Sequence, residues 1–227
     1  MEGRIKFFLI QDFERAHPSF ANKLLKTLEE PPKHVILCLT ASDRNSLLPT
    51  VVSRCQVFDL RPIDTDSMAW ALINKWSVDE SEAVLLARLS NGRLGWAVDL
   101  HEDPEGMVQR TGALQTLWRL VESNRIDRLA FAASLASNRN NQALFGMLEL
   151  WSTWWRDIML AQSGALDSCS NVDQLDEIQR QARVLAPPDV RRYLEMLNRT
   201  AGYLHHTVNT RLALDVLLLE MPQPLAG

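Results

Sequence analysis

Two short apolar runs constrain the first part of this chain most strongly. Lys6–Ile10 and residues 35–40 are almost wholly apolar, as are strands that are buried on both faces of a parallel sheet. Parallel neighbours require a crossover, and the segment between the runs has helical signals. Pro18 suits a first helical turn, and Pro31 and Pro32 would end the helix. Apolar residues recur on one side of that segment, at Phe20, Ala21, Leu24, Leu25 and Leu28.

After a short predicted helix at residues 48–53 and a third predicted strand at 56–60, the strand pattern ends at Arg61 and Pro62. The remaining segments have helical periodicity and are separated by Gly, Pro and Asn breaks. The expected fold class is α/β followed by all-α. The predicted helices cover residues 66–76, 79–90, 94–101, 107–121, 126–136, 140–163, 171–185, 188–202 and 204–220.

Composition restricts the class of protein. With 46% apolar and 23% charged residues among 227, the chain is typical of a globular protein. Its apolar runs are far shorter than the ~20 residues that cross a bilayer, and no secretion signal is evident. The three cysteines, Cys38, Cys55 and Cys169, form no CxxC pair, so we expect a reduced, cytoplasmic protein.

The net charge of −4 comes mainly from residues 64–110, which hold nine acids and four bases. We interpret this segment as a solvated face of short helices. Without a basic stripe, the chain is not expected to bind nucleic acid by itself.

Two short segments contain side chains that could take part in nucleotide binding or hydrolysis. The first apolar run leads into Gln11 and Asp12, where nucleotide hydrolases place acids that hold magnesium and position water. Gln11 is a neutral amide, so it offers neither an anionic ligand nor a general base, and we interpret this site as degenerate. The second site is Ser53-Arg54-Cys55, in which the planar guanidinium suits bidentate binding of phosphate.

The surroundings of Arg54 carry a family resemblance. Residues 22–32 read NKLLKTLEEPP, residues 47–50 read LLPT, and residues 53–55 read SRC. This series resembles the clamp-loader branch of the AAA+ ATPases over roughly residues 6–60; Lys23 stands where the family usually has a small residue. The resemblance implies a partial AAA+ parallel-sheet core at residues 1–62, a three-helix lid at 63–110 and a helical collar at 111–227.

Within that family, the resemblance favours the non-hydrolysing delta-prime type of DNA polymerase III subunit. Gln11 replaces the leading acid of the family's Asp-Glu pair. Gly95 falls where the sensor-2 arginine of the motor subunits is expected, two positions after Arg93. Residues 209–214, NTRLAL, resemble the end of the delta-prime collar. Trp151, Trp154 and Trp155 lie at helical spacing, and we interpret them as core or subunit contact.

No GxxxxGK[ST] loop occurs in the sequence, and the four-cysteine zinc module of family members is absent, so we expect an N-terminally truncated form that holds no nucleotide, metal or cofactor. The resemblance implies a role for Arg54 as an arginine finger in trans, with Ser53 and Cys55 supporting the motif. The implied partners are the gamma/tau motor subunits and the delta subunit in a hetero-pentamer, the sliding clamp indirectly, and primed DNA only through the complex, with no membrane.

Two alternatives stay open. One is a gamma/tau-like motor subunit whose P-loop region is missing, and the other is a helical interaction protein that retains an AAA+ fragment. The delta subunit is disfavoured because its core normally lacks a clean Ser-Arg-Cys series.

Overall fold

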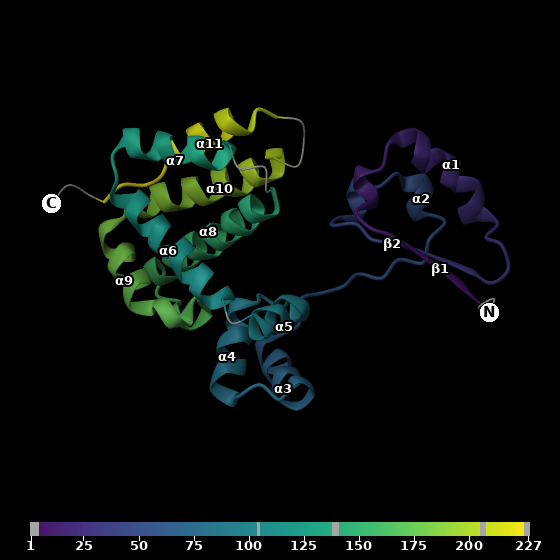
Figure 1. Cartoon of the computed structure of the whole chain (residues 1–227), viewed down its shortest axis with the longest axis horizontal. Helices are drawn as coiled ribbons and strands as arrows, with labels where there is room; N and C mark the ends of the chain where they lie inside the picture. The colour runs from purple at the N-terminus through teal and green to yellow at the C-terminus, as the bar shows by residue number, and fades with distance from the viewer. Residues whose placement is uncertain (1–4, 104, 138–140, 205–207, 225–227) are drawn as a thin grey trace. The chain divides into compact units, whose positions relative to one another are not determined.

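The computed structural model describes residues 5–103, 105–137, 141–204 and 208–224. The chain divides into two compact units, Met1–Leu60 and Arg61–Gly227, and each is described by itself. The chain is mostly helical, with one small parallel sheet (Figure 1). Within the described residues, no helix has the length and apolar character needed to cross a bilayer.

The first unit is a strand–helix–strand arrangement followed by short helical turns. Strands β1 (Lys6–Ile10) and β2 (Val35–Leu39) are parallel, with Lys6 opposite Val35 and Ile10 opposite Leu39. The connecting helix α1 (Pro18–Glu29) begins at the predicted proline and ends before the Pro-Pro pair. The remaining elements are η1 (Phe13–Arg15), η2 (Arg44–Ser46) and α2 (Pro49–Val52).

The predicted third strand is wrong, because residues 56–60 form no strand. A strand is defined by its ladder, and the described sheet has only the order β1–β2. The apolar side chains of this segment are therefore left exposed, with Phe58 73% and Leu60 94% accessible. The predicted burial of the sheet on both faces is also wrong: side chains of α1 and α2 pack on one face, and the described residues leave the other face exposed.

Register explains which face is open. Alternate residues of a strand point to opposite faces. Ile10 and Leu39 pack into the small core around Phe13, Ala21 and Val51.

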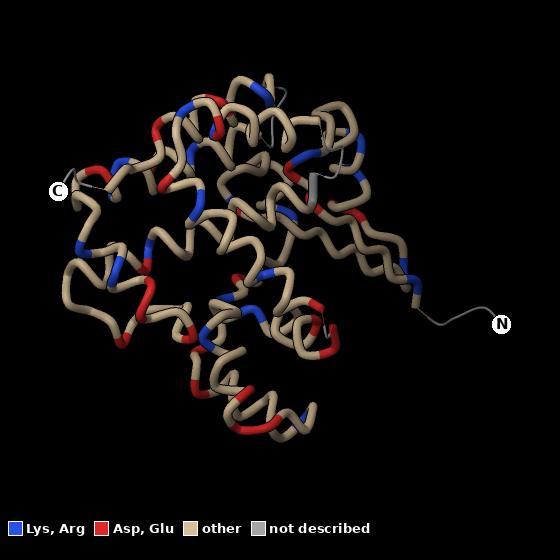
Figure 2. The backbone as a smooth tube through the Cα atoms, turned by 60° about the vertical axis from the view of Figure 1, so that its left-hand side comes forward, with Lys and Arg blue, Asp and Glu red and all other residues tan. Residues whose placement is uncertain are grey.

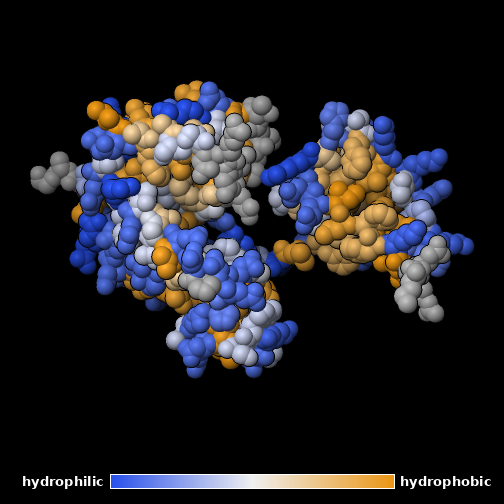
Figure 3. Space-filling view, viewed as in Figure 1, coloured by the Kyte–Doolittle hydropathy of each residue, from blue (hydrophilic) through white to orange (hydrophobic). Residues whose placement is uncertain are grey.

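On the opposite face, Phe7, Leu9 and Ile36 form an apolar row. The three residues are 61%, 52% and 48% exposed. Apolar side chains gather on the surface of this unit in Figure 3. We call these three residues the open sheet face.

Helices α3 (Thr65–Trp76), α4 (Glu80–Leu89) and α5 (Leu94–Glu102) have a core of their own. Its centre consists of fully buried Met68, Leu72, Ala83 and Ala97. Asp64 and Asp79 accept N-cap hydrogen bonds from the backbone N–H groups of Ser67 and Ser81. Acidic residues prevail along these helices (Figure 2), in agreement with the charge distribution of the sequence.

The larger part of the second unit is built from six helices. The elements are α6 (Gly106–Glu122), α7 (Arg125–Ser137), α8 (Asn141–Gln162), α9 (Leu175–Val184), α10 (Pro187–Leu204) and α11 (Thr210–Leu219), with turns η3 (Leu166–Ser168) and η4 (Val172–Gln174). The predicted helix at 204–220 begins only at Thr210, because Asn209 caps it by accepting a hydrogen bond from the N–H of Leu212. Residues 205–207 lie outside the described residues.

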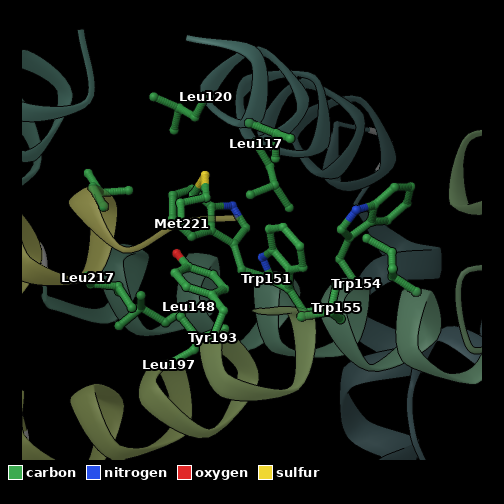
Figure 4. Close-up of a cluster of buried hydrophobic side chains, with 14 of the residues drawn as sticks. Leu117, Leu120, Leu148, Trp151, Trp154, Trp155, Tyr193, Leu197, Leu217 and Met221 are labelled. Carbon is green, nitrogen blue, oxygen red and sulfur yellow. The ribbon is translucent and has the colours of Figure 1, made fainter. Parts of the chain in front are cut away.

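Helix α8 carries the aromatic core of this helical group (Figure 4). Trp151, Trp154 and Trp155 are all completely buried, as the interpretation of a core cluster required. The Trp155 ring meets Tyr193 of α10 at a centroid distance of 4.9 Å, edge to face, and the indole N–H of Trp154 donates to Gln181 at 3.1 Å. Their burial excludes the exposed faces that a base-stacking platform would need.

Candidate functional site

Arg54 lies just beyond the C-terminal end of α2, a helix of four residues. Pro49 supplies the first-turn residue of α2, and Val51, which is 1% exposed, anchors its inner side. The backbone N–H of Arg54 donates to the carbonyl of Val51 at 3.0 Å and that of Cys55 to Val52 at 3.2 Å, so the turn extends past the helix. Ser53 and Arg54 consequently point outward, while Cys55 packs against the small core of the unit.

The guanidinium of Arg54 is held by groups of its own unit. Its Nε donates to Oε1 of Glu29, the last residue of α1, at 2.7 Å, and Nη2 donates to the same oxygen. Nη1 donates to the carbonyl of Thr50 at 2.9 Å and contacts Oγ of Ser53 at 3.4 Å. Ser53 also donates its hydroxyl to Thr50 O at 3.2 Å. The Arg54 side chain is 31% exposed, so it lies on the surface while making these contacts.

Cys55 supports the motif from beneath. Partial burial raises the pKa of its thiol, which therefore stays protonated at neutral pH and acts as a small apolar group.

Gln11 and Asp12 directly follow β1, at the carboxyl end of the sheet. Both are exposed, and Asp12 adopts a left-handed backbone conformation with φ of 50°. The N–H of Asp12 is bonded to Oγ1 of Thr40, just after β2, at 3.2 Å. Its carboxylate lies 3.6 Å from Arg15. Asp12 thus has local partners of its own, separate from those of Arg54.

Glu14, which was not singled out from the sequence, accepts hydrogen bonds from the hydroxyl and N–H of Ser42 at 2.7 and 3.1 Å. The hydroxyl bond is the main cause that holds the pKa of this carboxyl below its usual range. In the described residues, no group of three or more His, Cys, Asp or Glu side chains could hold a metal ion.

Gly95 lies in the first turn of α5 and is exposed. An added Cβ would meet nothing within 4 Å, so crowding does not explain why a glycine stands there. Arg93, the N-cap residue of α5, forms an ion pair with Glu149 of α8 and lies 5.7 Å from the ring centre of Trp96. It therefore serves the contact of α5 with α8 in the second unit.

Reasoning from the sequence missed Glu29. In the sequence, Glu29 belongs to the family-like series at residues 22–32, which predicts no role for it. Its position in the sequence indicates a role, because an acid at the last residue of a helix is destabilised by the negative end of the helix dipole. Such an acid is expected to have a compensating partner.

Comparisons with known proteins follow these structural boundaries. A family model described as DNA polymerase III, delta subunit, matches residues 1–64, and one described as DNA polymerase III, delta subunit, C terminal, matches residues 104–223. The second begins close to the start of α6 and ends after α11.

Several curated proteins are similar along the chain. The Escherichia coli K12 DNA polymerase III subunit tau is 27% identical over 240 residues, which cover 96% of this chain and 37% of that protein. The Bacillus subtilis subunit delta' is 24% identical over 227 residues, 98% of this chain and 68% of that protein. The Haemophilus influenzae subunit delta' is 36% identical over 115 residues, 50% of this chain and 34% of that protein. The chain thus spans little more than a third of the tau relative.

Among solved structures, the Bacillus subtilis DNA clamp loader delta protein (YqeN) matches with a TM-score of 0.39 and 15% identity, over 97% of this chain and 78% of that one. The C-terminal family model covers more than half of the chain, and the tau and delta' relatives from Escherichia coli and Bacillus subtilis match 96% and 98% of it. The chain therefore belongs to the DNA polymerase III delta-subunit family and is a member of the clamp-loader proteins.

Proposed function

We propose that this chain is a non-hydrolysing, delta-prime-like stator of the DNA polymerase III clamp loader and that Arg54 acts in trans on ATP bound by a neighbouring subunit. The observation that carries the proposal is the placement of Arg54, at the surface just after the end of α2 and within the Ser-Arg-Cys series. A guanidinium on a surface side chain is suited to meet a phosphate that another subunit presents.

The chemistry needs only a fixed cation. During phosphoryl transfer, negative charge is spread over the three equatorial oxygens of the transferred γ-phosphoryl group, and an inserted guanidinium stabilises it. Such arginine fingers accelerate hydrolysis by ~10³–10⁵ in other systems. Because the finger comes from a neighbour, hydrolysis becomes conditional on correct assembly of the ring.

Two positions support the absence of hydrolysis by this chain. Gln11 stands at the end of β1, where a motor needs an acid, and its amide cannot accept the proton of an attacking water. Gly95 leaves the sensor-2 position without a cation, although the space around it would admit a side chain.

The architecture supports a division of the chain into three parts. Residues 1–62 would be a partial AAA+ core, α3–α5 the lid, and α6–α11 the collar that joins the other subunits. The two separate helical cores of the second unit fit this division. The proposed boundary between lid and collar at residue 110 lies within the first turns of α6, which begins at Gly106. The partners would be gamma/tau and delta subunits in a hetero-pentamer that acts on the sliding clamp and primed DNA.

The test is Arg54→Ala in a loader reconstituted with this chain, with Arg44→Ala, an exposed arginine of the same unit, as the matched control. Steady-state ATP hydrolysis is measured with clamp and primed DNA, and assembly is measured by gel filtration. We expect hydrolysis at the facing site to fall by roughly 10³-fold or more for Arg54→Ala. Arg54→Lys should recover only part of the rate, because an ammonium cannot donate bidentately. Unchanged hydrolysis by an intact Arg54→Ala loader would refute the finger assignment.

A tau-like motor is the second candidate, favoured by the 27% identity to the tau subunit over 96% of this chain. Titration calorimetry of this chain with Mg²⁺ and ATP tests for the motor. A micromolar dissociation constant would favour it, whereas a stator and a motor without its GxxxxGK[ST] loop should both release no binding heat.

A further inference from the structure

Contacts within the chain occupy one edge of the Arg54 guanidinium. Glu29 accepts from Nε and Nη2 along that edge, and Thr50 accepts from Nη1. Bidentate binding of a phosphate requires two N–H groups on one edge. While the Glu29 contact is intact, the Nε–Nη2 edge is therefore not available to a phosphate.

From this geometry we propose that Glu29 retains Arg54 in a retracted position and releases it when a nucleotide phosphate on the neighbouring subunit competes for the same N–H groups. The inference rests on the proposed function and adds to it a regulatory residue. Glu29 is a positioning residue in this scheme, since it acts only through Arg54.

The position of Glu29 supports a role beyond folding. It ends α1, where a carboxylate is disfavoured by the helix dipole and where a basic residue would be the stabilising choice. The guanidinium of Arg54 compensates for that placement. An acid at the C-terminal end of a helix breaks a local stability rule. Proteins keep such exceptions mainly at functional sites, and this one contacts the candidate functional residue Arg54.

The ion pair between Arg54 and Glu29 is weak enough to form and break reversibly. Arg54 and Glu29 are 31% and 50% exposed, and pairs this accessible favour the bound arrangement by only about 1.5- to 5-fold. A nucleotide phosphate carries more charge than one carboxylate and would meet the guanidinium in a subunit interface from which water is largely removed. It should therefore displace Glu29 without a separate trigger.

The test compares five loaders: the natural chain, Glu29→Gln, Glu30→Gln, Arg54→Ala and the double variant Glu29→Gln/Arg54→Ala. Glu30 is the matched control, because its substitution removes the same charge one residue away and keeps the Glu29–Arg54 pair. We expect kcat/KM for ATP to rise about 1.5- to 5-fold for Glu29→Gln, to be unchanged for Glu30→Gln, and not to rise when Arg54 is already alanine.

The outcomes separate this inference from the function on which it rests. If Arg54→Ala hydrolyses ATP normally, the finger assignment fails and the inference fails with it. If Arg54→Ala is slow but Glu29→Gln behaves like Glu30→Gln, only the retaining role of Glu29 is refuted. If Glu29→Gln is as slow as Arg54→Ala, Glu29 organises the finger and does not hold it back, which also overturns the proposal.

A second readout needs no other subunit. In ¹H–¹⁵N spectra of the full chain, the Arg54 Nε–H resonance should exchange more slowly with water in the natural chain than in Glu29→Gln, with Glu30→Gln unaltered. Equal exchange in all three would show that the pair does not form in solution and would overturn the proposal.

Discussion

Arg128 offers the sharpest test of what holds the helical group together. It lies on α7, is completely buried, and donates to the C-terminal carbonyls of two other helices. Nε donates to Leu120 O at 2.9 Å and Nη2 to Val121 O at 3.0 Å, both at the end of α6. Nη1 donates to Met221 O at 2.7 Å, just beyond α11. One cation thus meets the negative ends of two helix dipoles.

The cost of Arg128→Met follows from these bonds. Four carbonyls lose a charged donor, since Nη1 also donates to Leu218 O in the last turn of α11 at 3.4 Å, and each such hydrogen bond contributes up to ~1.5–3 kcal/mol. Part of this is returned, because burial costs a charged guanidinium several kcal/mol and also lowers the pKa of Arg128. We therefore expect the free energy of unfolding to fall by about 3–5 kcal/mol, because the carbonyls left without a donor outweigh the returned cost of burying the charge. Arg128→Lys should recover only part of this, since one ammonium cannot span both helix ends.

Urea unfolding followed by tryptophan fluorescence measures this change. All seven tryptophans lie beyond residue 60, so the signal reports on the second unit alone. Arg125→Met, on the exposed side of the same helix, is the control and should change stability by less than ~0.5 kcal/mol. A loss below ~1 kcal/mol for Arg128→Met would show that its carbonyl contacts do not hold the helices together.

Two further predictions concern the second unit. Gly92→Ala should destabilise the second unit by at least ~1 kcal/mol in the same urea assay, because φ of Gly92 is +83° and an added Cβ would lie 2.4 Å from Cβ of Pro62. The control is Gly95→Ala, where an added Cβ meets nothing within 4 Å. Equal losses of stability in the two variants would contradict the steric argument. Burial raises the pKa of Cys169 to about 11 from an ordinary value of 9.0, so its contribution to stability should be complete below pH 9 and decline as pH rises toward 11. Cys169→Ala should lose that alkaline component of the unfolding curve, and an identical pH dependence in both chains would refute the assignment.

Much of the fold could be predicted because it depends on local signals. Pro18 and the Pro31-Pro32 pair bound α1 as expected, and the spacing of Trp151, Trp154 and Trp155 predicted their burial. The third strand failed for a non-local reason. Val57, Phe58 and Leu60 give it an apolar character, but a strand also needs a ladder partner, which no local pattern can supply.

The candidate site was predictable only in part. Ser53-Arg54-Cys55 stood out through its neighbours in the sequence, and the structure brings its three residues together at one helix end. The partner of the guanidinium lies 25 positions earlier, on another helix. No spacing rule links Glu29 with Arg54, because their contact depends on how α1 and α2 pack against each other.

The open sheet face makes the stability of the first unit depend on its surroundings. Phe7, Leu9 and Ile36 keep water-exposed area that burial would stabilise at ~25 cal/mol per Å². Any molecule that covers this face in the folded state adds RT ln(1 + [L]/Kd) to the folding free energy, about 2.7 kcal/mol at a hundredfold excess over Kd. The fraction of chains in which the first unit is folded, with Arg54 in place, will therefore rise with the concentration of the molecule that binds this face. Folding of the unit and association at the face then form one linked equilibrium.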